Sequence, residues 1–292
     1  MMKKHAVPKI LGLIMTASSA LTVSQTASAM VTSATSTGYG AAIDLELLGL
    51  NLKVDPLPIG ASGSTPVVAP AAYNKDESFL NLIKTGKNGL IDISLPVLTG
   101  SAQSDVDGSA GDKITSAAGG VAGIGLSAIG LLGVPLLDLE LGALNADATV
   151  KGDYGSLSAV GDSSMADLTL RLLGLDVVPH LDLDAAPNTR VDLLGLLGLV
   201  GIDLTLNEQL VDGDPNGVCL ADSCSLEVNA LRLSFDSFPL GLNVLDGDIV
   251  LGHAYAQMSA LAVPVPATAW LFSSGVMALV GLGRRRKTQN IA

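Results

Sequence analysis

Residues 202–235 read IDLTLNEQLVDGDPNGVCLADSCSLEVNALRLSF and contain two stretches in which apolar and polar residues alternate. One covers residues 202–206, and the other covers residues 226–229 and then 231–235. Successive side chains of a β-strand point to opposite faces, so this alternation predicts strands with one buried and one wet face. The segment between them is rich in Asp, Gly, Pro and Asn, which favour turns. The stretch therefore predicts strands joined by a polar loop.

The same alternation recurs along the chain. It appears in residues 43–47, 50–54, 137–141, 168–172 and 181–184. Packing such strands into two sheets would bury the Leu faces and leave the Asp, Glu and Thr faces in water. The pattern predicts an all-β domain, either β-sandwich-like or an irregular barrel of bent Leu-rich strands.

A short motif, Leu-Leu-Gly followed by Leu or Val, begins at residues 47, 131, 172, 193 and 196, and residues 239–242 (PLGL) are related to it. At Leu48-Gly49 it shifts the phase of the alternation, as Gly does at a bulge or bend. We expect the motif to bend a strand from one sheet to the other. The alternative is a chance product of abundant Leu and Gly.

Three stretches lack the strand pattern. Residues 61–72 are rich in Ser, Pro, Ala and Gly, which predicts a loop. Residues 101–132 begin as a polar loop, and their second half (121–132) fits either a buried strand pair or a small-residue helix. Residues 75–82, KDESFLNL, predict one short helix.

The first 29 residues have the organisation of a secretory signal peptide. Lys3, Lys4 and Lys9 precede an apolar stretch, and Ala27-Ser28-Ala29 is a small-x-small cleavage site. Cleavage by signal peptidase after Ala29 would leave a secreted domain over residues 30–262.

The last thirty residues combine a Pro-rich start, an apolar run and a basic cluster. The apolar run, residues 267–283, is just long enough to cross the ~30 Å hydrocarbon core as a helix. Trp270 would sit at one membrane interface, and the basic cluster would hold the other end on the cytoplasmic side. The preceding chain would then lie outside the cytoplasm.

This tail resembles the PEP-CTERM sorting signal of Gram-negative bacteria, over residues 263–287. The resemblance is carried by Val263, Pro264, Val265, Pro266, Thr268, Trp270, Arg284, Arg285 and Arg286. Val265 replaces the usual acidic residue, which matches the VPLPA-type variant. The resemblance implies removal of the tail by an exosortase, transient anchoring in the inner membrane, and a surface or extracellular protein associated with exopolysaccharide or biofilm. An ordinary C-terminal membrane anchor is the alternative.

A second resemblance covers mainly residues 36–50 and 200–258. Gly38-Tyr39-Gly40-Ala41, residues 206–209 (LNEQ), residues 227–231 (EVNAL) and residues 252–256 (GHAYA) are similar to segments of the choice-of-anchor P family. That family groups bacterial surface proteins with similar ectodomains and different anchors. It implies a shared fold and no catalytic residues.

Cys219 and Cys224 are the two cysteines of the chain. Thiols of an exported protein meet an oxidising compartment and tend to pair. A metal site needs more ligands than two cysteines supply, and a redox pair would have a two-residue gap. The sequence therefore favours a local disulfide.

Residues 212–217, DGDPNG, match the start of a Ca²⁺ loop. Oxygens of Asp212, Asp214 and Asn216 would converge on the cation. Position twelve is Ser223 instead of Glu, with Asp222 beside it. A polar hairpin tip is the alternative, and Ca²⁺ is the one cofactor the sequence suggests.

The formal net charge of the chain is −12, and every acidic residue lies between Asp44 and Asp248. This region is therefore more acidic than the chain as a whole. Nucleic-acid binding depends on Lys and Arg contacts to phosphates, so the charge argues against a nucleic-acid partner. It fits cation binding, or simply keeps a Leu-rich domain soluble.

The sequence contains no Gly-x-Ser-x-Gly, His-Glu-x-x-His or phosphate-loop motif. His180, Asp182 and Asp184 would share one strand face and could hold a cation, or simply form a wet face. We expect His253 to be packed or exposed and not catalytic. The leading hypothesis is thus an exported non-enzyme. A module that binds a lipid, a glycan or Ca²⁺ and a hydrolase with an unrecognised site are the alternatives.

Overall fold

The computed structural model describes residues 28–47, 50–57, 60–62, 72–85, 91–129, 135–172, 174–176, 185–191, 201–240, 243–263, 272 and 274–278. These residues confirm the expectation of an all-β fold. One compact unit, the β body, spans Ala29–Ala262, and a second unit comprises Met1–Ser28 and Val263–Ala292. In the second unit, residues 272 and 274–278 are helical. None of the described helical residues belongs to a helix long and apolar enough to span a bilayer.

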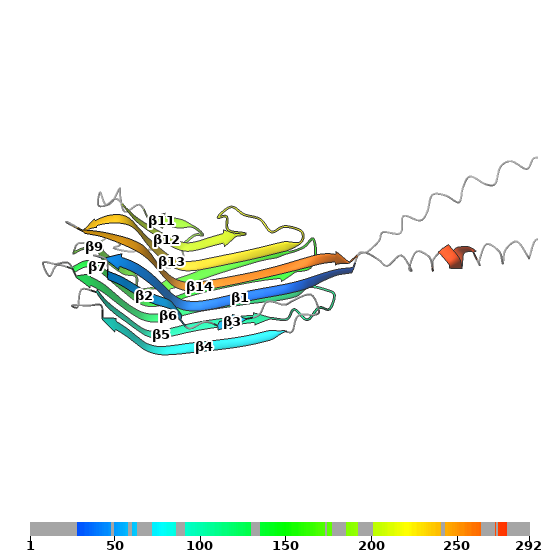
Figure 1. Ribbon diagram of the computed structural model, residues 1–292. Helices are drawn as coiled ribbons and strands as arrows, with labels where there is room; N and C mark the ends of the chain where they lie inside the picture. The colour runs from blue at the N-terminus through cyan, green and yellow to red at the C-terminus, as the bar shows by residue number, and fades with distance from the viewer. Residues whose placement is uncertain are drawn as a thin grey trace, which may run out of the picture. The chain divides into compact units, whose positions relative to one another are not determined.

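Two antiparallel sheets form the β body (Figure 1). Sheet A contains, in spatial order, β11 (Thr189–Val191), β12 (Ile202–Val211), β13 (Ser223–Leu240), β14 (Asn243–Val263), β1 (Ser28–Leu47) and β2 (Leu50–Leu57), and β3 (Gly60–Ser62) pairs with β1. Sheet B contains β10 (Leu175–Asp176), β9 (Thr169–Leu172), β7 (Pro135–Gly152), β6 (Lys113–Ile129), β5 (Ile91–Ser104) and β4 (Tyr73–Thr85), and β8 (Ser158–Ala166) pairs with β7.

The core lies between the sheets and consists mainly of the Leu, Ile, Val and Ala side chains that the alternation places on one face of each strand. Its largest fully buried side chains come from both sheets: Leu45 and Leu204 from sheet A, and Leu95, Leu98, Leu126 and Leu139 from sheet B. Each such side chain contributes about 2 kcal/mol through removal of apolar surface from water. The predicted burial of Leu faces between two sheets is therefore what holds the body together.

The first and last long strands of the β body are neighbours in sheet A. The Thr32 hydroxyl donates to the Ser259 carbonyl oxygen at 3.2 Å. Further along both strands, a side chain on Gly247 would collide with the backbone of Asp44. From the first contact to the second, the residue number rises in β1 and falls in β14, so the two strands run antiparallel. The β body therefore begins and ends in neighbouring strands.

Each long strand changes the phase of its alternation at one level of the body. In β13 the inward positions are 224, 226 and 228, then 231, 233 and 235. In β14 they are 249 and 251, then 254, 256 and 258, and in β7 they are 137, 139 and 141, then 144, 146 and 148. The long strands of both sheets bend together at this level (Figure 1). Gly252, with φ +60°, supplies the bend in β14.

The Leu-Leu-Gly motif has a different role from the one predicted. Leu47 pairs with Leu50, and Leu172 pairs with Leu175, so these two copies close the β1–β2 and β9–β10 hairpins. Gly174 has φ +75°, as the third residue of several tight turns requires. The prediction that the motif bends a strand between sheets is therefore wrong for both copies. The copies that begin at residues 131, 193 and 196 lie outside the described residues.

Two further predictions are wrong for the same physical reason. Residues 75–82 are not a helix but part of β4, which pairs with β5 from Tyr73↔Ser104 to Thr85↔Asp92. Residues 121–129 are neither a strand pair nor a helix, because they continue β6 between β5 and β7. In both cases hydrogen bonding to a neighbouring strand overrides a weak local preference.

Candidate functional site

A cluster of polar and aromatic side chains lies on sheet A where its strands bend. The cross-strand pairs Glu208↔Asn229 and Asn229↔His253 align one side chain from each of β12, β13 and β14. Tyr39 of β1 completes the row, and its ring stacks on that of His253 with centroids 4.2 Å apart and planes 14° apart. We call Tyr39, Glu208, Glu227, Asn229, Arg232, Asp248 and His253 the bend cluster.

Asn229 is the centre of the bend cluster and is only 2% exposed. Its Nδ2 donates to Glu208 Oε2 at 2.8 Å and to Glu227 Oε1 at 3.0 Å. Both amide N–H groups are thus used, so Asn229 Oδ1 accepts the remaining contact, 2.7 Å from His253 Nδ1. His253 therefore carries its proton on Nδ1, and the polar atoms of this buried amide are all satisfied.

Arg232 balances part of the negative charge around Asn229. Its Nη1 lies 3.4 Å from Glu208 Oε1, and its Nε lies 3.4 Å from Asp248 Oδ1. The two carboxylates raise the pKa of Arg232 against the opposing effect of its burial. The guanidinium thereby links β12, β13 and β14 on the face of the sheet that carries His253.

Burial controls the ionisation of the two stacked rings. It lowers the pKa of His253 to about 4, against a smaller opposing effect from Glu208. It also raises the pKa of Tyr39 to about 12. Both rings are therefore neutral at pH 7. An imidazole that already donates to an amide and packs against a phenol is suited to holding strands together.

The four segments that carry the resemblance to the choice-of-anchor P family meet at the bend cluster. Residues 38–41, 206–209, 227–231 and 252–256 come from four neighbouring strands of sheet A. The sequence predicted that His253 is packed or exposed, and in the structure it is packed. No motif in the sequence predicted a role for Tyr39, Asn229 or Glu208. The feature of the sequence that could have indicated these residues is the break in the apolar–polar alternation at 229–231 and at 252–254.

Glycine lets sheet B touch the backbone beneath the bend cluster. A Cβ on Gly119 of β6 would collide with the carbonyl oxygens of Tyr39 and His253. A Cβ on Gly40 of β1 would lie 2.6 Å from the Gly120 carbonyl oxygen and 2.9 Å from Leu98 Cδ2. At this level the two sheets are in backbone contact, so no ligand fits between them here.

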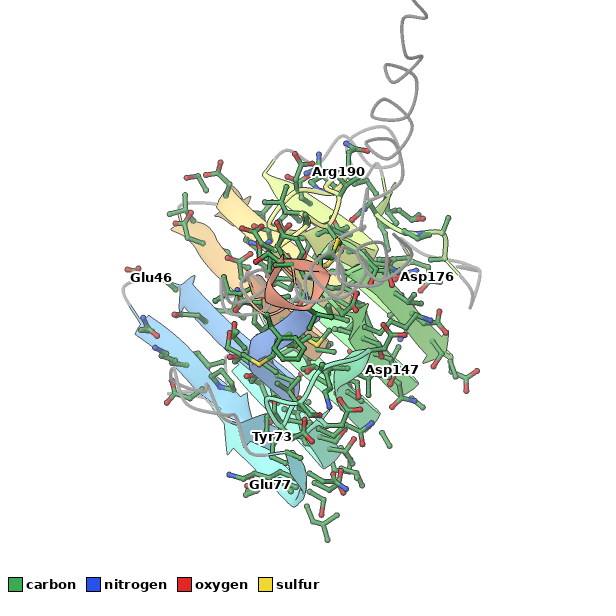
Figure 2. The ribbon with its side chains drawn as sticks, turned by 90° about the vertical axis from the view of Figure 1, so that its right-hand side faces the viewer. Glu46, Tyr73, Glu77, Asp147, Asp176 and Arg190 are labelled. Atoms are coloured by element: carbon green, nitrogen blue, oxygen red, sulfur yellow. A yellow bond between two sulfur atoms is a disulfide. The ribbon has the colours of Figure 1, made fainter. Side chains whose placement is uncertain are left out.

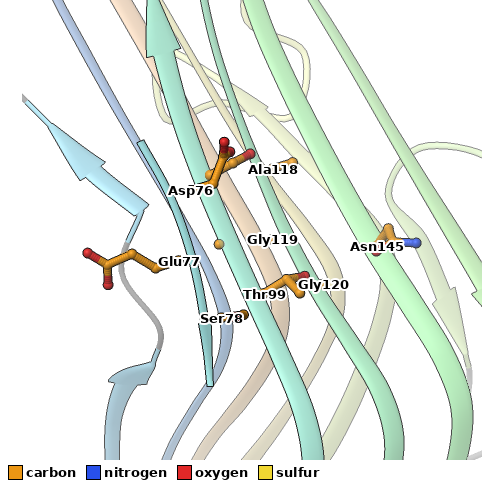
Figure 3. Close-up of a pocket in the computed structure, with 10 residues that line it drawn as sticks. Asp76, Glu77, Ser78, Thr99, Ala118, Gly119, Gly120 and Asn145 are labelled. Atoms are coloured by element: carbon orange, nitrogen blue, oxygen red, sulfur yellow. The ribbon is translucent and has the colours of Figure 1, made fainter. Parts of the chain in front are cut away.

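A second candidate is a hollow of about 280 Å³ on sheet B, where β4, β5, β6 and β7 run side by side (Figure 3). Its lining residues are short and mostly polar: Asp76, Glu77, Ser78, Thr99, Gly100, Ser101, Ala118, Gly119, Gly120 and Asn145. A Cβ on Gly120 would meet the side chains of Asn145 and Thr99, so the missing side chain makes room for both. The hollow thus offers carboxylates, hydroxyls and an amide above a floor of small residues.

Two facing carboxylates lie near this hollow. Asp147 of β7, which Figure 2 labels, pairs across the sheet with Asp162 of β8, and Ala118 of the lining pairs with Asp147 on its other side. Burial, and then the charge of Asp162, raise the pKa of Asp147. The carboxyl group of Asp147 therefore binds a proton, or attracts a cation, more readily than an isolated surface carboxylate does.

The structure joins Cys219 and Cys224 by a disulfide. Asp212 and Gly213 both have positive φ between Val211 and Asp214, which exchange two backbone hydrogen bonds. This is a tight hairpin turn of the Asp-Gly kind. Asp212 Oδ1 accepts from the Ser225 backbone at 2.8 Å, and Asp214 Oδ1 accepts from the Asn216 backbone at 2.8 Å.

The described residues contain no group of three His, Cys, Asp or Glu side chains arranged to hold a metal ion. Ca²⁺ at Asp212, Asp214 and Asn216 stays a prediction.

His180, Asp182 and Asp184 lie outside the described residues, as do Ala27 and nearly all of the tail motif. Within the processing motifs, Ala29 lies in β1 and Val263 is the last residue of β14.

The chain matches no protein-family model, no curated protein and no solved structure.

Proposed function

We propose that the chain is an exported, non-catalytic protein of the cell surface or extracellular matrix, processed at its C-terminus by an exosortase. Signal peptidase would act after Ala29, the tail helix would hold the protein transiently in the inner membrane, and the exosortase would then release the β body. Association with exopolysaccharide or biofilm is part of the proposal, and it depends on the resemblance of the tail.

The observation that carries this proposal is the position of the tail motif relative to the last strand. β14 ends at Val263, the first residue of the motif. Cleavage at residues 264–268 would therefore leave intact every strand and every core residue that the structure describes. A sorting signal has to follow the folded domain in this way, since its removal must leave that domain intact.

Two features of the β body support export. The disulfide between Cys219 and Cys224 suits an oxidising compartment, because cytosolic thiols are kept reduced. The acidic surface of the region between Asp44 and Asp248 would keep the released domain soluble.

The test is the intact mass of the protein purified from native cells with and without the exosortase gene. We expect a shortened C-terminus, cut within residues 264–268, only where the exosortase is present. A double variant, Pro264→Ala with Pro266→Ala, should accumulate uncut, whereas Gln289→Ala, which lies beyond the signal at residues 263–287, should not. A wild-type protein that still ends at Ala292 would overturn the proposal.

The hollow on sheet B favours a second candidate, the binding of a polar ligand such as a glycan. Its hydroxyls, carboxylates and amide suit hydrogen bonding to sugar hydroxyls, while its lining lacks the aromatic platform that many sugar sites use. Binding of purified native exopolysaccharide should fall in Asn145→Ala and persist in Ser158→Ala, a control on β8. Equal binding by both variants would remove this candidate.

A further inference from the structure

Strand β4 forms one border of sheet B. It is 13 residues long, and among the described strands it is hydrogen-bonded only to β5. In Figure 2, Glu77 of β4 projects at the border of the ribbon. A border strand presents a row of backbone N–H and C=O groups that another strand can pair with.

The side chains of β4 do not block such pairing. Leu80 is 66% exposed, Ile83 is 67% exposed and Phe79 is 38% exposed. Natural proteins usually protect a border strand by making it short, by adding Pro, or by placing charges along it. β4 is long and contains no Pro. Its charged residues, Lys75, Asp76, Glu77 and Lys84, flank a middle that holds exposed apolar residues, so its centre is open to pairing.

The register with β5 shows which positions of β4 share a face. Glu77 and Phe79 pair with Gly100 and Leu98, which are buried. Positions 82 and 84 pair with Leu95 and Ile93, which are also buried. The inward positions of β4 are therefore 77 and 79, then 82 and 84, and the phase changes between Leu80 and Asn81.

This change of phase restricts how β4 can pair with a copy of itself. A two-fold axis perpendicular to a sheet keeps each face on its own side, so opposed residues must lie on the same face. For β4, an axis between Leu80 and Asn81 meets this condition. The bends of the two strands then coincide, and position 78 opposes position 83 of the second copy.

The same axis matches residues of complementary character. It sets Glu77 opposite Lys84 and Phe79 opposite Leu82, and the symmetry repeats both pairs. Moving the axis by one residue in one direction opposes Lys75 to Lys84, and in the other direction it opposes Phe79 to Lys84. We propose that β4 pairs antiparallel with β4 of a second copy about this axis, so that sheet B continues across a dimer.

The decisive experiment uses the full-length protein as purified from cells that export it. In the double variant Ser78→Cys with Ile83→Cys, the new cysteines of one copy lie opposite those of the other and should form intermolecular disulfides. Within one copy they are about 17 Å apart, at ~3.3 Å per residue, whereas a disulfide needs Cα atoms within ~7 Å. Cys219 and Cys224 are already paired, so they add little background. We expect a covalent dimer band in electrophoresis without reductant, which reductant converts to monomer, and at most traces of this dimer from either single variant.

Charge exchange supplies an independent readout. In sedimentation equilibrium, Glu77→Lys or Lys84→Glu alone should weaken the dimer at least tenfold, and the two combined should restore it. Circular dichroism would establish that each variant is folded. A wild-type protein that stays monomeric at ~100 μM, where even weak specific pairs associate, would overturn the proposal. Equal cross-linking by the single and double cysteine variants would also overturn it.

Discussion

The imidazole ring of His253 stacks on the phenol ring of Tyr39, and the two side chains come from β14 and β1, the last and first long strands of the β body. Asn229 connects this stack to Glu208 and Glu227. The stack therefore joins the first and last long strands of the β body through side chains, in addition to the backbone pairing of these strands.

Replacing His253 with Gln should make stability less sensitive to acid. The pKa of His253 is lowered from 6.5 to about 4 by burial, so between these pH values the unfolded chain binds a proton that the folded protein does not. The free energy of unfolding therefore falls as pH drops from 6.5 towards 4, by about 3 kcal/mol in total. Urea unfolding at pH 7 and pH 4 measures this loss.

In the His253→Gln variant the loss between pH 7 and pH 4 should be about 2–3 kcal/mol smaller than in the wild type. The nearby groups Glu208, Glu227, Arg232, Asp248 and Tyr39 remain in both proteins, so the difference isolates the histidine. Identical pH dependence of the two proteins would contradict the prediction.

Tyr39→Ala should lower the free energy of unfolding by about 2–3 kcal/mol, because it removes a stacked ring and exposes the imidazole beneath. The pKa of His253 should rise towards its usual range for the same reason, as an NMR titration of the ring would show. Tyr39→Phe is the matched control, since it keeps the stack and should change both quantities little. A Tyr39→Ala protein with an unshifted His253 pKa would show that the stack does not bury this ring.

Gly119→Ala should be the most damaging single-methyl change in sheet B. The added Cβ would collide with the backbone of both Tyr39 and His253, which cannot rotate away. The sheets must move apart, at a cost of about 3 kcal/mol or more. Gly125→Ala, in the same strand, is the control, because its Cβ would meet only Ser94 Cβ at 3.9 Å. The melting temperatures of the two variants should differ by about 6–12 °C, and equal melting temperatures would refute the close contact of the sheets.

Removing the disulfide through Cys219→Ala and Cys224→Ala should destabilise the protein by about 2 kcal/mol, the value expected from loop entropy for so short a loop. The bond closes a sequence separation of 5 residues, and Cys224 is fully buried. Adding reductant to the wild type should reproduce the loss in chemical unfolding experiments. If the double variant matched the wild type, the disulfide would have no part in stabilising the loop before β13.

The strands with unbroken alternation could be predicted from the sequence. Residues 137–141 and 202–206 lie in β7 and β12, because one buried and one wet face leave a period of two in any sequence. β4 could not be predicted in this way. All of its described side chains between residues 74 and 80 are exposed, so no buried face marked it as a strand.

The bend cluster was only partly predictable. The segments that contain it resemble segments of the choice-of-anchor P family, and the alternation of apolar and polar residues breaks at 229–231 and 252–254. Their meeting at one level depends on the registers of four strands, which involve pairs such as Asn229 and His253 far apart in the sequence. No local pattern records such a register, because it is fixed by the hydrophobic faces of every strand together.

The sequence by itself determined the all-β class, the Leu-rich buried faces and the acidic surface, because each depends only on composition and on a period of two residues. The tertiary structure decided which glycines turn the chain and which let the sheets touch. Gly174 closes a hairpin, Gly119 lets the two sheets touch, and Gly252 bends β14. In the sequence, all three glycines have similar neighbours, mostly Leu and Ala. What separates them is the neighbouring strand that each one meets, and pairing and packing between distant segments alone define that neighbour.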